Sequence, residues 1–315
     1  MPSICVVGSL VMDLVVWLDH LPKLHETQPA HRFQRHAGGK GLNQALTAKR
    51  CGAHVSLIGK IGKDSFGQDF LQLLETEDID HRALYQSESV ATSFAMPMIL
   101  PSGDNSIILV PQANMALQPH ELNKHATLIQ HSDVLMLQLE IPHATSLRAA
   151  QLARQAKPLV ILNPAPATQD ISELLPLVDW LIPNEMEAAT LSNMPVHNTQ
   201  DALVAGHKLL ERGVRRGVIV TLGALGAVCV TPENCWHVGT IPTKVMDTTG
   251  AGDAFCGAFA TALANQLALA DALRWASAAG AFAVSVVGAS PSLPREQNIQ
   301  HLLQQADIPI TEIIS

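Results

Sequence analysis

The chain has 315 residues, of which 47% are hydrophobic, 15% charged and 4% aromatic, and its formal net charge is −8. This apolar share can fill one large core, in one domain or in one domain with a small appendage. The absence of basic clusters and the few aromatic residues argue against a nucleic-acid partner, and no apolar run is long enough to cross a membrane.

The N-terminal segment carries no positive charge ahead of its apolar stretch. Residues 4–8 read Ile-Cys-Val-Val-Gly, which is typical of a buried strand ending at a glycine turn and not of a secretion signal. No Cys-x-x-Cys pair and no His-Glu-x-x-His sequence occurs, so we expect reduced thiols in a cytoplasmic protein and scattered histidines in place of a zinc site. The five cysteines are Cys5, Cys51, Cys229, Cys235 and Cys256.

Short apolar runs alternate with segments of helical spacing along most of the chain. The expected strands cover 4–8, 55–58, 134–137, 159–162, 180–182 and 218–221, and the expected helices include 65–77, 146–156, 200–212 and 253–264. Short buried strands that alternate with helices predict an α/β fold, in which helices cover both faces of a mostly parallel central sheet. Ligands of such sheets bind beyond the carboxyl ends of the strands.

Two segments depart from this alternation. Residues 11–37 alternate like a strand and include two prolines, and residues 91–110 predict a hairpin around the turn at 101–105. We expect both segments to leave the core and to form a small β-sheet lid over the site, within a single domain that covers residues 1–315.

The strongest chemical signal is Asp-Thr-Thr-Gly-Ala-Gly-Asp at residues 247–253, ahead of an apolar helix. Two glycines let backbone N–H groups converge, and a helix N-terminus adds positive potential, so the turn suits a phosphoryl group. Asp253 at its rim is placed to take a proton from an attacking hydroxyl; the alternative is an Asp that only caps the helix. Phe255 excludes a Gly-x-Gly-x-x-Gly dinucleotide motif, and no P-loop sequence is present.

Two further motifs suit a sugar. The turn Gly-Gly-Lys-Gly-Leu-Asn at residues 38–43 opens a helix that reaches about Cys51, and Lys40 and Asn43 offer donors for hydroxyl groups. Asp13 lies just past the first strand, at the ligand edge of the sheet. The alternative for the turn is a glycine loop with a solvated lysine.

Two motifs farther along suit a nucleotide and its metal ion. Asn184 and Glu187 lie three residues apart at a helix start, where they either position waters around Mg²⁺ or only cap the helix. Residues 221–226, Thr-Leu-Gly-Ala-Leu-Gly, place a glycine turn after a strand, as a nucleotide site requires.

In the order of these motifs, the sequence resembles ribokinases within the PfkB group of carbohydrate kinases, and the resemblance covers essentially the whole chain. Gly-Ala-Gly-Asp marks the whole group, whereas Gly-Gly-Lys-Gly favours ribokinases over fructokinases or adenosine kinases. The resemblance implies a ribokinase-like three-layer α/β/α fold with a small β-sheet lid. It rests on residues 39–41, 138–140, 163–167, 183–185 and 247–253.

The resemblance also implies an ATP-dependent kinase that phosphorylates the 5-hydroxyl of a pentofuranose, with D-ribose as the first candidate, Mg²⁺ bound with ATP and K⁺ as activator. Asp253 would be the base, next to an anion hole of Gly250, Ala251 and Gly252. The residues implied to bind the sugar are Val11, Asp13, Gly39, Lys40, Asn43 and Glu140. Those implied to bind ATP are Asn184, Thr221, Gly223 and Gly226, with Glu187 holding Mg²⁺ through water. Those implied to hold the monovalent cation are Asp247, Thr249, Ala283, Val286, Gly288 and Ser292.

Ribokinases are typically homodimers joined through their lids, so the resemblance implies a homodimer here as well. One departure concerns the substrate: ribokinases usually have Asn where this chain has Val11, and deoxyribokinases place an apolar residue there. A kinase of 2-deoxyribose, of another furanose or of a nucleoside therefore remains an alternative. A non-catalytic sugar- or nucleotide-binding regulator is a second alternative, which the intact Asp253 disfavours because a pure binder needs no base.

Overall fold

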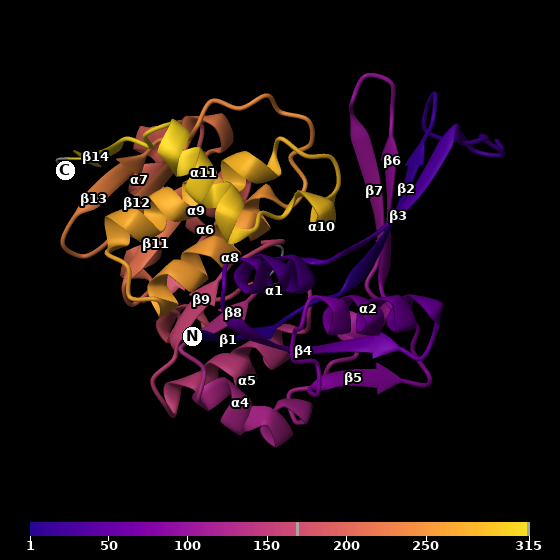
Figure 1. Ribbon diagram of the computed structural model, residues 1–315, viewed down its shortest axis with the longest axis horizontal. Coiled ribbons are helices and arrows are strands. Elements are labelled where there is room, and N and C mark those ends of the chain that lie inside the picture. Colours follow the sequence, from indigo (N-terminus) through magenta and orange to yellow (C-terminus); the bar gives the residue numbers. More distant parts are fainter. Residues whose placement is uncertain (168–169, 314–315) are drawn as a thin grey trace.

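Ten strands form the main sheet in the computed structural model, which describes residues 1–167 and 170–313 (Figure 1). Pairing is parallel from β5 to β11 and antiparallel from β11 to β14. The predicted mostly parallel sheet is therefore confirmed. In spatial order the strands are β14 (Ile310–Ile313), β13 (Cys235–Val238), β12 (Ala227–Val230), β11 (Gly217–Thr221), β10 (Trp180–Leu181), β9 (Leu159–Leu162), β8 (Val134–Leu137), β1 (Ser3–Val7), β4 (His54–Gly62) and β5 (Leu84–Ser87).

Helices cover both faces of this sheet and create two separate cores. Successive side chains of a strand point to opposite faces, so Ile4 and Val6 of β1 join one core while Cys5 and Val7 join the other. This arrangement gives the expected three layers. The first core contains α1 (Lys40–Arg50), α2 (Ser65–Thr76), α8 (Ala251–Ala264), α9 (Leu269–Ala283) and α11 (Glu296–Gln305). The second contains α4 (Ala126–Gln130), α5 (His143–Arg154), α6 (Glu185–Ser192) and α7 (Thr199–Glu211).

A second, four-stranded sheet projects from the main body (Figure 1). It is built from the two segments that the sequence set apart, and β2 begins four residues after β1 ends, so the small sheet leaves the main sheet directly at the carboxyl end of β1. Its order is β3 (Arg32–Gly38), β2 (Val11–Trp17), β6 (Phe94–Ile99) and β7 (Asn105–Val110). Two short helices flank the region between the sheets, α3 (Gln112–Met115) and α10 (Ala289–Ser292).

The predicted element boundaries differ from the observed ones by a few residues. The helix expected at 146–156 spans His143–Arg154, and the strand expected at 55–58 spans His54–Gly62. The helix expected to start at Asp253 starts at Ala251, because Gly250 is its N-cap residue, with a φ of 81°.

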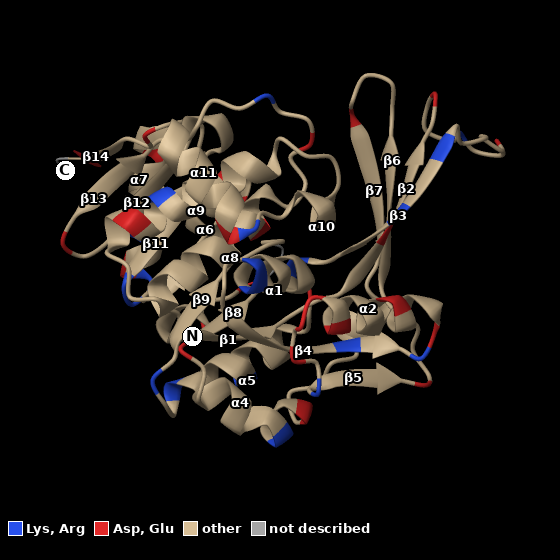
Figure 2. Cartoon of the chain, viewed as in Figure 1, with Lys and Arg blue, Asp and Glu red and all other residues tan. Residues whose placement is uncertain are grey.

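In the cartoon of Figure 2, the positions of acidic and basic residues are interspersed over the fold, without a continuous basic stretch. None of the helices in the described ranges has the length and apolar character that a membrane span requires.

Candidate active site

A cavity of about 910 Å³ lies between the small sheet and the carboxyl ends of the main strands. Most of the predicted site residues line it, although they come from segments far apart in the chain. Those that line it are Val11, Asp13, Gly39, Lys40, Asn43, Glu140, Asn184, Glu187, Thr221, Asp247, Thr249, Gly250, Gly252, Asp253 and Gly288. Those outside its lining are Ala251, Gly223, Gly226, Ala283, Val286 and Ser292.

Asp253 lies in the first turn of α8, and both of its carboxylate oxygens accept side-chain hydrogen bonds. Asn43 Nδ2 donates to Oδ2 at 2.9 Å and Gln44 Nε2 donates to Oδ1 at 3.0 Å. The helix cap is Gly250, so the alternative in which Asp253 only caps the helix is wrong. Asp253 is 6% exposed, and its oxygens are aimed by two amides of α1.

The glycine turn before α8 presents backbone to the cavity mainly through Gly250 and Gly252. Among the described residues, no atom lies within 4 Å of the place where a Cβ of Gly252 would stand. The N–H of Ala251 donates to Thr248 O at 3.3 Å. Of the three residues expected to form an anion hole, Ala251 is thus partly engaged within the turn, and the two glycines are the ones that face the cavity.

Four ionisable side chains, those of Asp13, Lys40, Glu140 and Asp253, gather at the N-terminal end of α1. The backbone N–H of Lys40 donates to Glu140 Oε2 at 3.0 Å, and Ser9 Oγ donates to the same oxygen. Burial, followed by the charges of Glu140 and Asp253, raises the pKa of Asp13 to about 7. Burial opposes the charged form of Lys40, but the surrounding carboxylates outweigh it and raise the pKa of Lys40 above its ordinary value. A neutral ligand rich in hydroxyl groups matches this mixture of acceptors and one strong donor.

Val11 and Asp13 lie on the same side of β2, because they are two residues apart on a strand. Val11 is 4% exposed and both residues line the cavity. Ser9, two residues before Val11, is fully buried and accepts a hydrogen bond from Gly41 N at 3.2 Å. Ser9 thereby connects Glu140 to the glycine turn, a role that sequence reasoning missed although Ser9 directly follows the strand predicted at 4–8.

Asn184 and Glu187 form a complete capping box at the start of α6. Asn184 Oδ1 accepts from Glu187 N at 2.8 Å, and Glu187 Oε2 accepts from Asn184 N at 2.9 Å. The capped helix start, one of the two interpretations of this pair, is therefore present. Both residues also line the cavity, and burial raises the pKa of Glu187.

The loop at 288–293, which includes the short helix α10, lies beside Asp247, and its first two residues, Gly288 and Ala289, line the cavity. Asp247 Oδ2 accepts from Gly288 N at 2.9 Å, and Asp247 Oδ1 accepts from Thr249 Oγ1 at 2.7 Å. Ser292 lies behind this loop, fully buried, and its hydroxyl donates to Ala289 O at 2.7 Å. The carboxylate of Asp247 thus links the loop to the segment that leads into α8.

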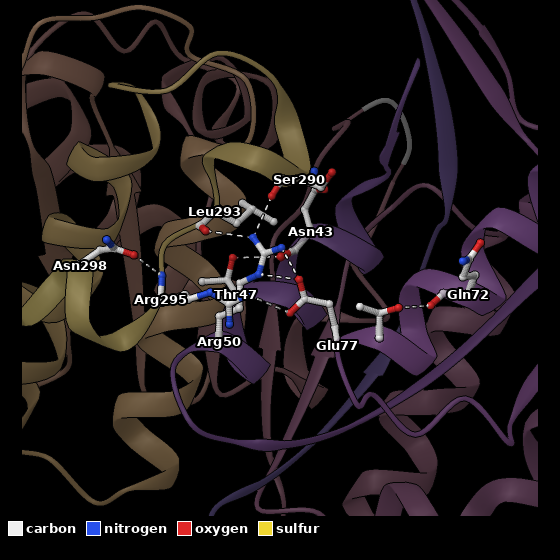
Figure 3. Close-up of polar contacts among 10 residues, drawn as sticks. Asn43, Thr47, Arg50, Gln72, Glu77, Ser290, Leu293, Arg295 and Asn298 are labelled. Atoms are coloured by element: carbon white, nitrogen blue, oxygen red, sulfur yellow. Dashed lines mark hydrogen bonds and ion pairs between the residues drawn. The ribbon is translucent and has the colours of Figure 1, made fainter. Parts of the chain in front are cut away.

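Arg50, at the other end of α1, anchors the same loop (Figure 3). Its guanidinium donates to Ser290 O at 2.8 Å and to Leu293 O at 3.0 Å, and it is paired with Glu77 of the turn that follows α2. The side chains of Arg50 and Glu77 are 11% and 12% exposed, so this ion pair is shielded from solvent. Helix α1 therefore contacts Asp253 near one end and the 288–293 loop at the other.

The cavity offers few ligands of its own for a divalent metal ion. Within residues 1–167 and 170–313, no three His, Cys, Asp or Glu side chains are grouped so as to hold a metal ion. Mg²⁺ commonly binds through one or two carboxylates together with substrate phosphates. This cavity, with Glu187 and Asp253 on its wall, fits a metal that is brought in with a nucleotide.

Comparison with known families decides the class of this protein. The model of the pfkB family carbohydrate kinases matches residues 1–296. The chain belongs to the pfkB family of carbohydrate kinases. This carbohydrate kinase is accordingly a phosphotransferase with an alcohol group as acceptor.

Several relatives of this carbohydrate kinase are similar over nearly their whole length. It is 37% identical to a ribokinase of Mus musculus over 302 residues, covering 94% of this chain and 93% of the relative. It is 30% identical to a deoxyribokinase of Salmonella typhi, covering 96% and 98%. It is 35% identical over 315 residues, 99% of this chain, to a bifunctional ribokinase/ribose-5-phosphate isomerase A of Fructilactobacillus sanfranciscensis, but spans only 58% of that protein.

Among solved structures, this carbohydrate kinase resembles the ribokinase of Arabidopsis thaliana complexed with ribose and ATP. The TM-score is 0.91 at 33% sequence identity, and the match covers 96% of this chain and 99% of that one. The likeness confirms the ribokinase-like fold that the order of the sequence motifs indicated.

Proposed function

We propose that this chain is an ATP-dependent kinase that phosphorylates the 5-hydroxyl of a pentofuranose, with D-ribose as the first candidate. The observation that carries the proposal is the placement of Asp253. Its carboxylate lies on the wall of the cavity, in the first turn of α8, and two amides hold it there. Asp13, Lys40 and Glu140 line the same cavity. A relative of the same fold was solved with ribose and ATP, which supports the same pair of ligands here.

In the proposed reaction, Asp13, Lys40 and Glu140 hold the sugar so that its primary hydroxyl meets Asp253. Asp253 accepts the proton of that hydroxyl as its oxygen attacks the γ-phosphorus in line with the leaving oxygen. The backbone of Gly250 and Gly252 and the N-terminus of α8 stabilise negative charge on the transferred group. Thr221 and the turn with Gly223 and Gly226 border the nucleotide end.

Mg²⁺ bound with ATP would neutralise phosphate charge, and Asn184 and Glu187 would hold its waters. Their side chains form the capping box at this end of the cavity, so they are fixed in place before the nucleotide arrives. The small sheet, residues 11–37 and 91–110, would act as a lid that excludes water, within one domain that spans the chain. These roles are tested by sugar-dependent ADP release: ADP formation that is equal with and without sugar would favour a non-catalytic or unspecific site.

We propose that Val11 adapts the site to sugars that lack one hydroxyl. Val11 offers no hydrogen-bond partner, so it cannot reward a hydroxyl as an Asn does. We expect 2-deoxyribose to be phosphorylated with a kcat/KM comparable to that of ribose or better, and Val11→Asn to shift the ratio of the two toward ribose by about tenfold, the scale of one buried hydrogen bond.

The measurement for Val11 is kcat/KM with both sugars on three proteins. Val15→Asn is the matched control, since Val15 lies on the same side of β2 and also lines the cavity, but pairs with Gln34 of β3, whereas Val11 pairs with Gly38 beside the glycine turn. A wild type that prefers ribose by more than about a hundredfold, with a ratio that Val11→Asn leaves unchanged, would show that this position does not discriminate the sugars.

We propose that K⁺ binds beside the 288–293 loop and activates the enzyme. Asp247 and Thr249 would hold it together with backbone carbonyls of Ala283, Val286, Gly288 and Ser292. An ion there would steady the segment that carries Gly250, which fits the way in which Asp247 already links the loop to that segment. Equal turnover in potassium, sodium and tetramethylammonium salts would remove this ion site.

We also propose that the chain forms a homodimer through the small sheet and works in the cytoplasm. On β7, Ile108 is 52% exposed on one face of the small sheet, whereas Ile107 and Leu109, 59% and 45% exposed, lie on the other face and line the cavity; exposed apolar side chains such as Ile108 often mark interfaces. The five cysteines are free and buried, as suits a reducing compartment. Sedimentation analysis tests the first proposal, since a monomer at micromolar concentration contradicts it, and cell fractionation tests the second.

A further inference from the structure

Helices α1 and α8 make three contacts that follow one another along α8 at intervals of one turn. Asp253 meets Asn43 and Gln44, Gly257 meets the backbone of α1, and Thr261 Oγ1 donates to Ala48 O at 3.4 Å. A Cβ on Gly257 would lie 2.7 Å from Gln44 O and 2.7 Å from Thr47 Cβ, which is closer than carbon atoms pack. The two helices therefore come this close only because residue 257 is Gly.

Gln44 and Asn43 hold the two oxygens of Asp253 from different sides. Asn43 lines the cavity, whereas Gln44 is fully buried and does not. Gln44 thus cannot touch a substrate in the cavity. Gln44 donates to Oδ1 of the carboxylate from the protein interior. The other oxygen, Oδ2, which accepts from Asn43, is the one on the cavity side, where a hydroxyl group of a substrate would approach.

A chain of buried amides fixes the orientation of Gln44. Asn163 Nδ2 donates to the backbone oxygen of Ile182 at 2.8 Å, so Asn163 Oδ1 faces Gln44 Nε2, 3.3 Å away. The NH₂ group of Gln44 then lies between two acceptors, Asn163 and Asp253, and its carbonyl accepts from Gln138 Nε2 at 2.6 Å. Because a backbone carbonyl anchors the chain, Gln44 cannot reverse its amide without losing these bonds.

The charges around Asp253 make such a hold necessary. Carboxylates of Asp13 and Glu187 share the cavity wall, and Lys40 is the one lysine among its lining residues. A carboxylate that is 6% exposed is stable only when its oxygens are hydrogen-bonded. Asn43 faces the substrate, so Gln44 is the donor that stays in place through the reaction.

We propose that Gln44 is a positioning residue that aims the carboxylate of Asp253, and that Gly257 sets the helix spacing which lets Gln44 reach it. This inference rests on the proposed role of Asp253 as base. It assigns catalytic consequence to two residues that lie outside the cavity.

The test replaces Gln44, the amide donor, with a side chain of similar volume that cannot donate a hydrogen bond. Gln44→Met is expected to lower kcat by roughly 10–100-fold, the effect of losing one hydrogen bond to a charged group, with the KM values for sugar and ATP within about threefold of wild type, since neither substrate touches Gln44. The control is Thr47→Val on the same face of α1, whose hydroxyl donates only to Asn43 O of its own helix, at 3.0 Å (Figure 3). Thr47→Val should keep the wild-type kcat.

Gly257→Ala provides a second, independent arm. The added methyl group must push α8 from α1, so kcat should fall while KM is kept, and the double variant Gln44→Met/Gly257→Ala should lose little more than the worse single variant because both break the same contact. If Gln44→Met does not fold, Gln138→Met, which removes the donor to Gln44 Oε1, should give a smaller loss of the same kind. Wild-type kcat in Gln44→Met, a loss confined to KM, or an equal loss in Thr47→Val would overturn the proposal.

A crystal structure of Gln44→Met separates this proposal from that of the sugar kinase. The carboxylate of Asp253 should turn away from its wild-type position. An unchanged carboxylate overturns the positioning role whatever the activity, whereas wild-type protein that phosphorylates no sugar would refute the proposed function and leave the displaced carboxylate as support for the positioning role.

Discussion

Asp253→Asn is expected to lower kcat by about 10²–10⁴-fold, the usual contribution of general acid–base catalysis, while the fold and sugar binding persist. The amide cannot take up the proton of the hydroxyl. The site can still accommodate it, because the carbonyl of the new Asn can accept from Gln44, and Asn43 can turn its own carbonyl toward the new NH₂ group. Asn43 Oδ1 is buried and lacks a hydrogen-bond partner among the described residues, so this turn breaks no other bond.

The measurement pairs turnover with binding. Sugar-dependent ADP release gives kcat, and calorimetric titration gives the sugar Kd, which should stay within a fewfold of wild type. Asp271→Asn is the matched control, since Asp271 also lies in the first turn of a helix, α9, but is 61% exposed and paired with Arg274. Turnover of Asp253→Asn within about threefold of wild type, far short of the loss expected for a base, would exclude Asp253 from this role.

Asp13→Asn is expected to raise the KM for the sugar by roughly 100-fold, the scale of one to two hydrogen bonds to a charged group, with a smaller effect on kcat. Burial, with the charges of Glu140 and Asp253, raises the pKa of Asp13 from 3.8 to about 7 in the free protein. Hydroxyl groups of a bound sugar favour the carboxylate form, so binding releases a proton from Asp13 below this pH. Sugar affinity should therefore fall as the pH drops below about 7 and level off above it.

The raised pKa of Asp13 also makes the stability of the fold depend on pH, in the direction opposite to that of sugar affinity. The folded state holds the Asp13 proton more tightly than the unfolded state does, so this group's contribution is full below pH 3.8 and is lost as the pH rises through about 7. Affinity should rise and the unfolding free energy contributed by Asp13 should fall over one pH interval. Asp13→Asn should flatten both curves, whereas Asp19→Asn, an exposed control just past the end of β2, should flatten neither. A wild-type KM independent of pH between 5 and 8 would contradict this assignment.

Much of the fold could be predicted because parallel strands buried on both faces are uninterrupted apolar runs. The runs at 134–137 and 159–162 match β8 and β9 residue for residue. The antiparallel edge, β12 to β14, was not predicted, because β13 (Cys-Trp-His-Val) and β14 (Ile-Thr-Glu-Ile) mix polar with apolar residues and none of the three strands carries a motif. Helix α9 was also missed, because its sequence is rich in alanine and lacks the regular alternation of large apolar and polar residues that marks an amphipathic helix.

The site was predictable where chemistry depends on local sequence and not where it depends on distant contacts. The glycines of the two turns, Asn43 and Asp253 belong to the motifs at 38–43 and 247–253, in which a few consecutive residues determine the local backbone conformation. Gln44 and Asp253 lie 209 residues apart, and Ser9 and Glu140 lie 131 apart. No periodicity in one sequence links such pairs, so the amide chain through Gln138 and Asn163 became visible only in the folded molecule.

The two cores on opposite faces of the main sheet support different parts of the proposed site. Helices α1 and α8, which aim Asp253, pack in one core, and α6, which carries Glu187, packs in the other. Under the proposed roles, we expect repacking of the first core to disturb Asp253 and, through α8, the turn at Gly250 and Gly252, and repacking of the second core to disturb the start of α6. Stabilising substitutions intended to leave the surroundings of Asp253 unchanged are therefore best placed in the second core, beneath α5 and α7.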